Sequence, residues 1–453
     1  MNVKPTLFSF SDPSQYDLVP RMFPYLDKHL IFPLLEFLQE KNIYEKKFIL
    51  HAKYDLLVDT HMTDYIMNLS QEMKLIDPSF ENRIEFDKKK EKELEEFETL
   101  DKESKGVLEV LENPEIIAAL RQDKAQNLQY LKESYGITVE MINSLYRLGK
   151  FQYNSGNYTN AVDLLYHFRA LSMDNELNIS ATWGKLASEI LTVNWERALE
   201  EVNKLKDIID TKNFSSPVFQ LKHRTWLIHW SLFPFFNHET GKEALCELFF
   251  SSSYMNTIQT SCPWILRYLT VAVITTRSQT RNAIHYQRRM KELVKVIDQE
   301  SYEYTDPVIQ FVKVLYIQFD FEDAQNFLKE AEKVLKNDFF LVGTCTEFID
   351  SAHYLIAEAY CKIYQRIDIN DLSKRLNFSH DQIVKFIHDD IVDLNAKIDF
   401  KEGTIVMNHL SQAIYQQIVE RIKGLNFRTQ VLAQTISRRQ QGDKKETISE
   451  IVT

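Results

Sequence analysis

The sequence predicts an all-α chain in which a right-handed, tetratricopeptide-like (TPR-like) solenoid of helical repeats precedes a small winged-helix subdomain and a long C-terminal helix. The first observation is composition. The 453 residues include only 10 Gly and 11 Pro, and a chain with few turn residues favours long helices and short connections. The second is a short motif that recurs along the middle of the chain. The third is a change from helical to alternating periodicity after residue 395.

The first 140 residues divide into a loose start and a set of helical hairpins. Residues 1–24 contain several prolines among polar residues and are predicted to be flexible. Residues 25–140 space their apolar residues at helical intervals, as at Leu34, Leu35 and Leu38, and are predicted to form short helix pairs. Within them the charge-dense linker 81–105 is interpreted as a solvated helix or hinge, with a regulatory partner site as the alternative.

The recurring motif lies in residues 141–365. Residues 157–162 read NYTNAV, and about 37 residues later the chain reads NWERAL at 194–199. Residues 320–324 (DFEDA) are a later copy. A small Ala beneath an aromatic residue lets paired helices approach closely, and such pairs must stack to bury their apolar faces. The region is therefore predicted to be an array of TPR-like repeats.

The aromatic segment 226–236 (WLIHWSLFPFF) follows the second copy of the motif. Its His229 is interpreted as a hydrogen-bonded core residue rather than a ligand, and Pro234 is expected to kink or end the helix. The four cysteines are far apart and form no CxxC pair, so each is interpreted as a small buried apolar residue.

Residues 366–410 carry the pattern of a winged helix. Leu372 and Leu376 mark a first short helix, and Ser379 with Gln382 forms a capping box for a second one. After that helix, apolar and polar residues alternate at 397–400, and a Lys-Glu-Gly turn leads to a second strand-like run. Two helices followed by two strands predict a winged helix whose wing is a strand pair.

A winged helix often binds DNA, but the predicted second helix opposes this use. It carries four aspartates against one lysine, Lys385, and phosphate groups would repel that charge. The better interpretation is a protein-pairing module whose wing offers an open strand edge to a neighbour.

Residues 411–437 are predicted to form one long amphipathic helix, and residues 438–453 a flexible tail. Apolar residues recur along this helix at a spacing close to that of a coiled coil. A helix of this kind normally packs on other helices, here those of other subunits. The repeat consists of Ile414, Ile418, Ile422, Leu425, Leu432 and Ile436, and the family resemblance described below implies that the first four form the seam of a helical bundle.

One segment is locally basic although the chain as a whole is acidic. The net charge is −11, so the overall field does not attract nucleic acid. The basic segment is interpreted as a solvated helix face, with a contact to RNA or to an acidic partner as the alternative. Its residues are Arg277, Arg281, Arg288, Arg289, Lys291 and Lys295.

The sequence contains no recognisable catalytic, metal-binding or targeting motif. None of the three Gly-Lys pairs precedes Ser or Thr, as a P-loop requires, and His238-Glu239 lacks the second histidine of a zinc-binding HExxH motif. No apolar run is suited to a signal peptide or a membrane span. The sequence therefore predicts a cytoplasmic protein without enzymatic activity, cofactor, metal, small-molecule substrate or membrane contact.

The wing and several longer blocks resemble a known family. The Ala396-Lys397-Ile398-Asp399 stretch, with Val406-Met407, resembles the PCI module shared by scaffold subunits of the proteasome lid, the signalosome and eukaryotic translation initiation factor three. The blocks at 30–44, 150–158, 183–191, 224–238, 266–275 and 337–342 resemble the e-subunit family of that initiation factor. The sequence departs from the family pattern at 81–105, around 276–290 and in the C-terminal tail.

The resemblance implies a scaffold that joins neighbouring subunits during assembly of the initiation complex on the small ribosomal subunit. The c and l subunits are the expected neighbours, the d subunit is expected to dock on this chain, and messenger or ribosomal RNA is expected only as an indirect partner. A PCI subunit of the signalosome or lid, or a winged-helix RNA-binding regulator, is the alternative. The implied pairing wing is Lys397, Ile398, Asp399, Phe400, Thr404, Ile405, Val406 and Met407.

Overall fold

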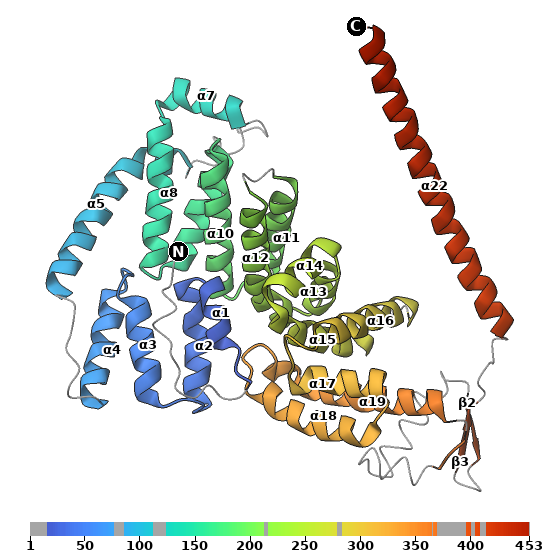
Figure 1. Cartoon of the computed structure of the whole chain (residues 1–453). Coiled ribbons are helices and arrows are strands. Elements are labelled where there is room, and N and C mark those ends of the chain that lie inside the picture. Colours follow the sequence, from blue (N-terminus) through green and yellow to red (C-terminus); the bar gives the residue numbers. More distant parts are fainter. Residues whose placement is uncertain are drawn as a thin grey trace. The chain divides into compact units, whose positions relative to one another are not determined.

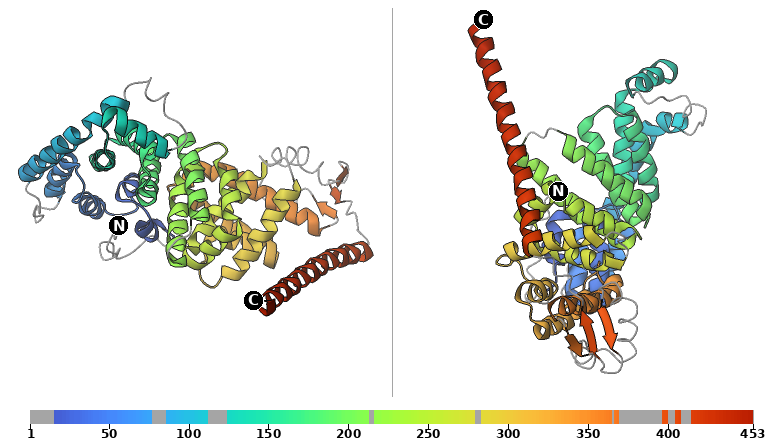
Figure 2. Two further views of the ribbon diagram at one scale, coloured as in Figure 1. Left: turned by 90° about the horizontal axis from the view of Figure 1, so that it is seen from above. Right: turned by 90° about the vertical axis from the view of Figure 1, so that its right-hand side faces the viewer.

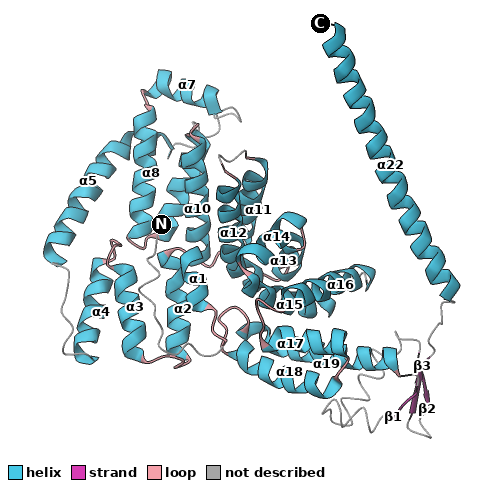
Figure 3. Ribbon diagram, in the orientation of Figure 1, coloured by secondary structure: helices cyan, strands magenta, loops and turns pink. Residues whose placement is uncertain are grey.

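Helices make up most of what the computed structural model describes, as the all-α prediction requires (Figures 1 and 3). Contacts divide the chain into two units, Met1–Ile356 and Ala357–Thr453, and each is considered by itself. The described residues are 16–76, 86–111, 124–212, 216–278, 283–364, 366–368, 396–399, 404–407 and 414–452.

Buried helical structure is present within the segment 1–24 that the sequence predicts to be flexible. Residues 1–15 of the predicted flexible segment lie outside the described residues, but Leu18, Met22 and Phe23 are buried. Pro20 and Pro24 occupy the first turn of α1 and of η2, where a missing N–H costs no hydrogen bond, so here proline starts a helix. The N-terminal elements are α1 (Val19–Met22), η2 (Phe23–Tyr25), α2 (Lys28–Glu40), α3 (Lys46–Leu57) and α4 (Thr63–Ile76).

The charge-dense linker is helical over most of its length. Helix α5 (Phe86–Leu111) exposes Leu94 but buries Leu100 and Val107, which pack in clusters with residues of α8. Residues 81–85 lie outside the described part of the chain. The segment is therefore a helix with one solvated face rather than a hinge, and the alternative of a regulatory partner site stays a prediction.

The middle of the first unit is a stack of helix pairs, as predicted. Each of α9 to α12 contacts the helix before it, and in the views of Figures 1 and 2 these green helices lie side by side. The bounds are α7 (Lys124–Tyr135), α8 (Val139–Asn154), α9 (Tyr158–Leu171), α10 (Asn175–Leu191), α11 (Trp195–Thr211) and α12 (Pro217–Asn237).

The recurring motif marks the same structural position in all three copies. Its first residue is the N-cap of a helix: Asn157 for α9, Asn194 for α11 and Asp320 for α18 (Phe321–Lys336). The alanine four residues later is fully buried in each copy, where a larger side chain would push the paired helices apart. These alanines are Ala161, Ala198 and Ala324.

The turn before each N-cap uses a left-handed backbone conformation. The residue just ahead of the motif has a positive φ in every copy: 87° at Gly156, 62° at Val193 and 58° at Phe319. The backbone N–H of the residue after Gly156, and that of the residue after Val193, donates to a carbonyl five residues earlier. This hydrogen bond ends the preceding helix. Only Gly adopts this conformation without strain, and a β-branched residue is the least suited to it.

Val193→Gly should therefore raise the free energy of unfolding by about 0.5–1 kcal/mol. Gly removes a left-handed strain of about 1–2 kcal/mol, and the greater freedom of Gly in the unfolded chain offsets part of this gain. Val193 is exposed, so the change loses little packing. Gly156→Val is the matched opposite: φ is +87° and an added Cβ would lie 3.3 Å from Cε of Met62. Chemical denaturation curves should move in opposite directions for the two variants; a destabilised Val193→Gly protein would contradict the strain argument.

The remainder of the first unit is built around a wholly buried helix, α15, on which α13, α16 and α17 pack. Pro234 lies inside α12, which ends at Asn237 just after it. The elements are α13 (Gly241–Phe249), α14 (Ser252–Ser261), η3 (Pro263–Ile265), α15 (Leu266–Thr275), η4 (Thr276–Ser278), α16 (Ala283–Glu300), α17 (Pro307–Lys313), η5 (Val314–Gln318), η6 (Val342–Thr344) and α19 (Cys345–Ile363), whose end enters the second unit.

The described part of the second unit holds a small sheet and one long helix. The strands β1 (Arg366–Asp368), β2 (Ala396–Asp399) and β3 (Thr404–Met407) are antiparallel in the order β1-β3-β2. Residues 369–395, which include both predicted helices of the winged helix, lie outside the described residues. Helix α22 (Ile414–Val452) continues past residue 437, where the sequence predicts a flexible tail.

Candidate interaction surfaces

The sheet differs from the predicted two-stranded wing in having a third strand. Ile405 of β3 pairs with Ile398 of β2 on one side and with Ile367 of β1 on the other. The run at 404–407 is therefore the central strand, and the outer edges of the described sheet belong to β1 and β2. The alternation of Arg366, Ile367 and Asp368 was the signal for β1, but three residues are too few to identify a strand from sequence.

The predicted wing residues come together in this sheet, with one exception. Lys397, Ile398 and Asp399 lie in β2 and the four residues of 404–407 form β3, while Phe400 lies outside the described residues. Side chains are described for Thr404 and Val406, which are half-buried. Pairing with another subunit through this sheet remains a prediction.

Helix α22 carries a stripe of large apolar side chains that face solvent. Ile418, Ile422 and Leu425 are 46%, 58% and 61% exposed, and Leu432 and Ile436 continue the stripe. The side chain of Ile414, the first residue of α22, lies outside what is described. Exposed apolar side chains along one face of so long a helix are typical of a surface that packs on other helices.

The predicted basic patch is only partly assembled. Arg288, Lys291 and Lys295 are exposed on α16, and Arg288 forms an ion pair with Glu292. Arg277 lies over the ring of Tyr354, and Arg289 is half-buried. Arg281 lies outside the described residues. The described structure therefore gathers three exposed cations on α16 rather than the six of the prediction.

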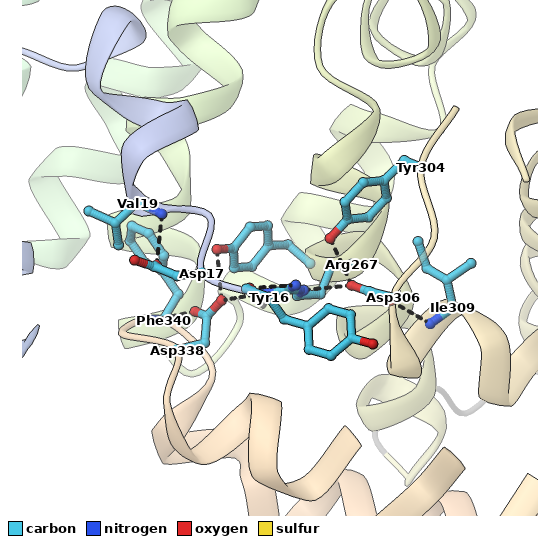
Figure 4. A network of polar contacts seen from close by, with 10 residues as sticks. Tyr16, Asp17, Val19, Arg267, Tyr304, Asp306, Ile309, Asp338 and Phe340 are labelled. Atoms are coloured by element: carbon cyan, nitrogen blue, oxygen red, sulfur yellow. Dashed lines mark hydrogen bonds and ion pairs between the residues drawn. The ribbon is translucent and has the colours of Figure 1, made fainter. Parts of the chain in front are cut away.

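A buried polar network, which the sequence did not reveal, joins distant parts of the first unit (Figure 4). Arg267 on α15 is 1% exposed, and its guanidinium binds two carboxylates: Nε lies 2.6 Å from Asp306 and Nη1 lies 3.3 Å from Asp338. Its Nη2 donates to the backbone carbonyl of Tyr16 at 2.9 Å. One side chain thereby joins the segment just ahead of α1, α15, the N-terminus of α17 and the loop after α18.

Each carboxylate of the network also caps backbone N–H groups. Asp306 is the N-cap of α17 and accepts from the N–H of Ile309 at 2.7 Å, and Asp338 accepts from the N–H of Phe340 at 3.0 Å. Burial raises the pKa of Asp338 although Arg267 and the hydroxyl of Tyr268 counter the effect. The network is structural: it fixes loops and offers no exposed reactive group.

His229 is the hydrogen-bonded core histidine that the sequence predicts. It is fully buried, with Nδ1 2.7 Å from the carbonyl of Thr225 and Nε2 3.2 Å from the indole N–H of Trp264. Nδ1 must therefore carry the proton and Nε2 must accept, which is the neutral tautomer. Burial lowers the pKa of His229 to about 4, and the hydrogen bond to Thr225 opposes this shift.

The described residues offer neither a metal site nor a membrane span. No group of three or more His, Cys, Asp or Glu side chains is placed to hold a metal ion in the part of the chain that is described. Among the helices described, none is both long and apolar enough to cross a bilayer. The four cysteines are free and buried, as predicted.

Three family models match the chain in order. The eIF3 subunit 6 N terminal domain matches residues 17–152, the PCI domain matches 328–409, and the C-terminal model for the E subunit of eukaryotic translation initiation factor 3 matches 413–433. The PCI match covers the residues whose resemblance the sequence suggested.

Curated relatives agree with these models over nearly the whole chain. The E subunit of eukaryotic translation initiation factor 3 from Aspergillus fumigatus is 53% identical over 430 residues, which cover 94% of each chain. The protein of the same name from Emericella nidulans is 54% identical over 424 residues, 92% of this chain and 93% of the relative. That of Sclerotinia sclerotiorum is 51% identical over 426 residues, 93% of each. The chain therefore belongs to the E-subunit family of eukaryotic translation initiation factor 3, and its PCI module makes it a scaffold subunit of that factor.

Proposed function

We propose that this chain joins its assembly in the cytoplasm through two surfaces, the stripe on α22 and the outer edge of the wing, and that it performs no catalysis itself. The c and l subunits are the proposed neighbours at these surfaces, the d subunit is the proposed docking partner, and the small ribosomal subunit is the platform on which the assembly acts. The coarser statement, association with other subunits of the factor, follows from the family. The proposal assigns that association to particular residues.

The stripe on α22 is the observation that carries the proposal. The helix has 39 residues, so it is about 58 Å long at a rise of 1.5 Å per residue. Five described side chains of the predicted repeat, from Ile418 to Ile436, are all at least 46% exposed. Packing against partner helices would remove this apolar surface from water, which is favourable by roughly 25 cal/mol for each Å² buried.

The wing contributes through backbone groups rather than side chains. In the order β1-β3-β2 the outer side of β2 has no strand beside it among the described residues. An open edge presents N–H and C=O groups that a strand of another chain can pair with. Because β3 is central, the residues of β2, Ala396–Asp399, are the ones proposed to meet a neighbouring subunit.

The double variant Ile422→Asp/Leu425→Asp should detach the chain from its assembly, because two carboxylates would be buried in the helix contact without partners. The expected result is at least a tenfold loss of the other factor subunits that co-purify with the tagged chain, which corresponds to about 1.4 kcal/mol or more. Gln430 is exposed on another face of α22, so Gln430→Asp is the control and should keep the full set. Stoichiometric recovery of all subunits with the double variant would refute the role of α22.

The alternatives carry less support. The matches over nearly the full chain are to the E subunit of the initiation factor, which favours that factor over the signalosome or the proteasome lid. For a winged-helix RNA-binding regulator, the basic segment 277–295 would have to act as one surface, and its arginines are divided between solvent and packing contacts.

A further inference from the structure

A cationic cavity lies among the helical repeats of the first unit. Its volume is about 580 Å³, inside the roughly 300–1,000 Å³ range of ligand pockets. The C-terminal ends of α9 and α11, the N-terminal half of α10 and the start of α7 form its walls. Four cationic side chains line it against one carboxylate, Glu201, in a chain whose net charge is −11. The cations are Lys124, Arg169, Lys204 and Lys212.

The single carboxylate does not neutralise the cavity. Glu201 is 1% exposed and binds three cations at once: Arg169 at 2.5 Å, Lys204 at 2.9 Å and Lys185 at 3.1 Å. Burial alone would raise the pKa of Glu201, but the hydrogen bond from Lys204 and the charges of Arg169 and Lys185 hold it below its usual value. Three positive charges on one ionised carboxylate leave an excess of positive charge.

Part of this charge has a structural role and part faces the opening. Lys124 donates to the carbonyls of Arg169 and Ser172, so it closes the C-terminal end of α9. The side chain of Lys204 is 48% exposed and that of Arg169 21% exposed. An anion entering the cavity would therefore meet Lys204 first and Arg169 behind it.

An aromatic ring and a side-chain amide complete the cavity. Tyr166 on α9 is 57% exposed, and the ammonium of Lys185 lies 5.0 Å from its ring centre, which restrains the ring at the cavity wall. Asn178 on α10 donates its amide to the carbonyl of Ser172 at 3.0 Å. Its Oδ1 atom is buried and accepts no hydrogen bond in the described structure. The hydrogen bond to Ser172 fixes Asn178 as part of the cavity wall.

We propose that this cavity binds a segment of single-stranded RNA, with phosphates at Lys204 and Arg169 and a base stacked on Tyr166. Cations that follow a backbone beside an exposed aromatic platform are how proteins hold single strands without reading their sequence. A phosphorylated peptide could use the same cations, but it would leave Tyr166 without a role. The inference goes beyond the scaffold function, which needs no contact to RNA.

The test is fluorescence anisotropy of a fluorescein-labelled oligocytidylate titrated with the full-length chain. Tyr166→Ala should weaken binding by about fivefold or more, the lower end of the measured value of stacking one base. Lys204→Gln should weaken it too and reduce the slope of log K against log salt by about 0.7, the value for one phosphate contact on a single strand.

Two exposed residues elsewhere supply matched controls. Tyr302→Ala removes an aromatic ring that is 85% exposed, and Lys329→Gln removes an exposed charge on α18. Loss of affinity in the cavity variants but not in the controls supports the proposal. Loss with Lys204→Gln but not with Tyr166→Ala, or displacement of the RNA by a phosphoserine peptide at lower concentration than by unlabelled RNA, overturns it in favour of a phosphorylated protein. Equal affinity for all variants overturns it outright.

Discussion

Arg267→Met should lower the free energy of unfolding by about 3–5 kcal/mol, since it leaves the buried carboxylates of Asp306 and Asp338 without their cation. A methionine fills much of the same space, so the loss is electrostatic rather than a cavity effect. The hydrogen bond from Arg267 to the carbonyl of Tyr16 is lost as well, so the segment just ahead of α1 is no longer bonded to α15 through this side chain. Against a typical domain stability of about 5–15 kcal/mol, this is among the largest effects a single substitution can have here.

Chemical denaturation of the full chain measures this loss, and a triple variant separates charge from packing. Arg267→Met with Asp306→Asn and Asp338→Asn removes the uncompensated charges, so it should recover a substantial part of the stability. A single variant as stable as the parent protein would contradict the role given to the network. So would a triple variant less stable than the single one.

The defect of Arg267→Met should also shrink in acid. Without the guanidinium, the pKa of Asp338, already raised by burial, would rise further above its unfolded value. A carboxyl whose folded pKa is raised binds its proton more readily in the folded state, so the folded protein gains stability as pH falls through that pKa. The difference between parent and variant should therefore be smaller at pH 5 than at pH 8.

How much of this fold the sequence predicts depends on how local the signal is. The motif beginning at Asn157 and Asn194 is read from a few neighbouring residues, and it marks helix starts because the N-cap, the aromatic residue and the alanine lie within two turns. Pro20 and Pro24 do not distinguish a flexible segment from a helix start, because proline is also favoured in the first turn of a helix. Strand β1 was not predicted, because a strand of three residues forms only by pairing with β3, which lies far along the chain.

The Arg267 network and the cationic cavity are even harder to predict from sequence, because their residues lie far apart along the chain. Arg267 is separated from Tyr16 by most of the first unit and from Asp338 by α16, α17 and α18, so no local spacing could show that they meet. The cavity with Tyr166 and Lys204 likewise takes residues from four helices. By contrast, the basic run 277–295 was visible in sequence, yet folding separates its members. Charge along a sequence indicates a surface only when the residues share one face.

Acid should destabilise the folded chain through His229, by about 3 kcal/mol in total between pH 6.5 and pH 4. The folded pKa of about 4 lies below the unfolded value of 6.5, so the unfolded state binds the proton more readily throughout this window. Stability is therefore complete above pH 6.5 and is lost as pH falls toward 4, at about 1.36 kcal/mol for each pH unit between the two pKa values. The geometry gives the same sign, because protonation would place a second N–H against the indole N–H of Trp264.

His229→Gln isolates this effect from the other histidines, several of which also have lowered pKa values through burial. Glutamine can donate to Thr225 and accept from Trp264 while staying neutral at every pH, so the variant should lose some stability at pH 7.5 but fall less steeply in acid. His285→Gln, at an exposed position on α16, is the control and should keep the parent slope. If His229→Gln and the parent lose stability in parallel between pH 6.5 and pH 4, the proton is taken up elsewhere. The neutral His229, which stacks on Tyr25 and accepts from Trp264, would then not be what makes this fold sensitive to acid.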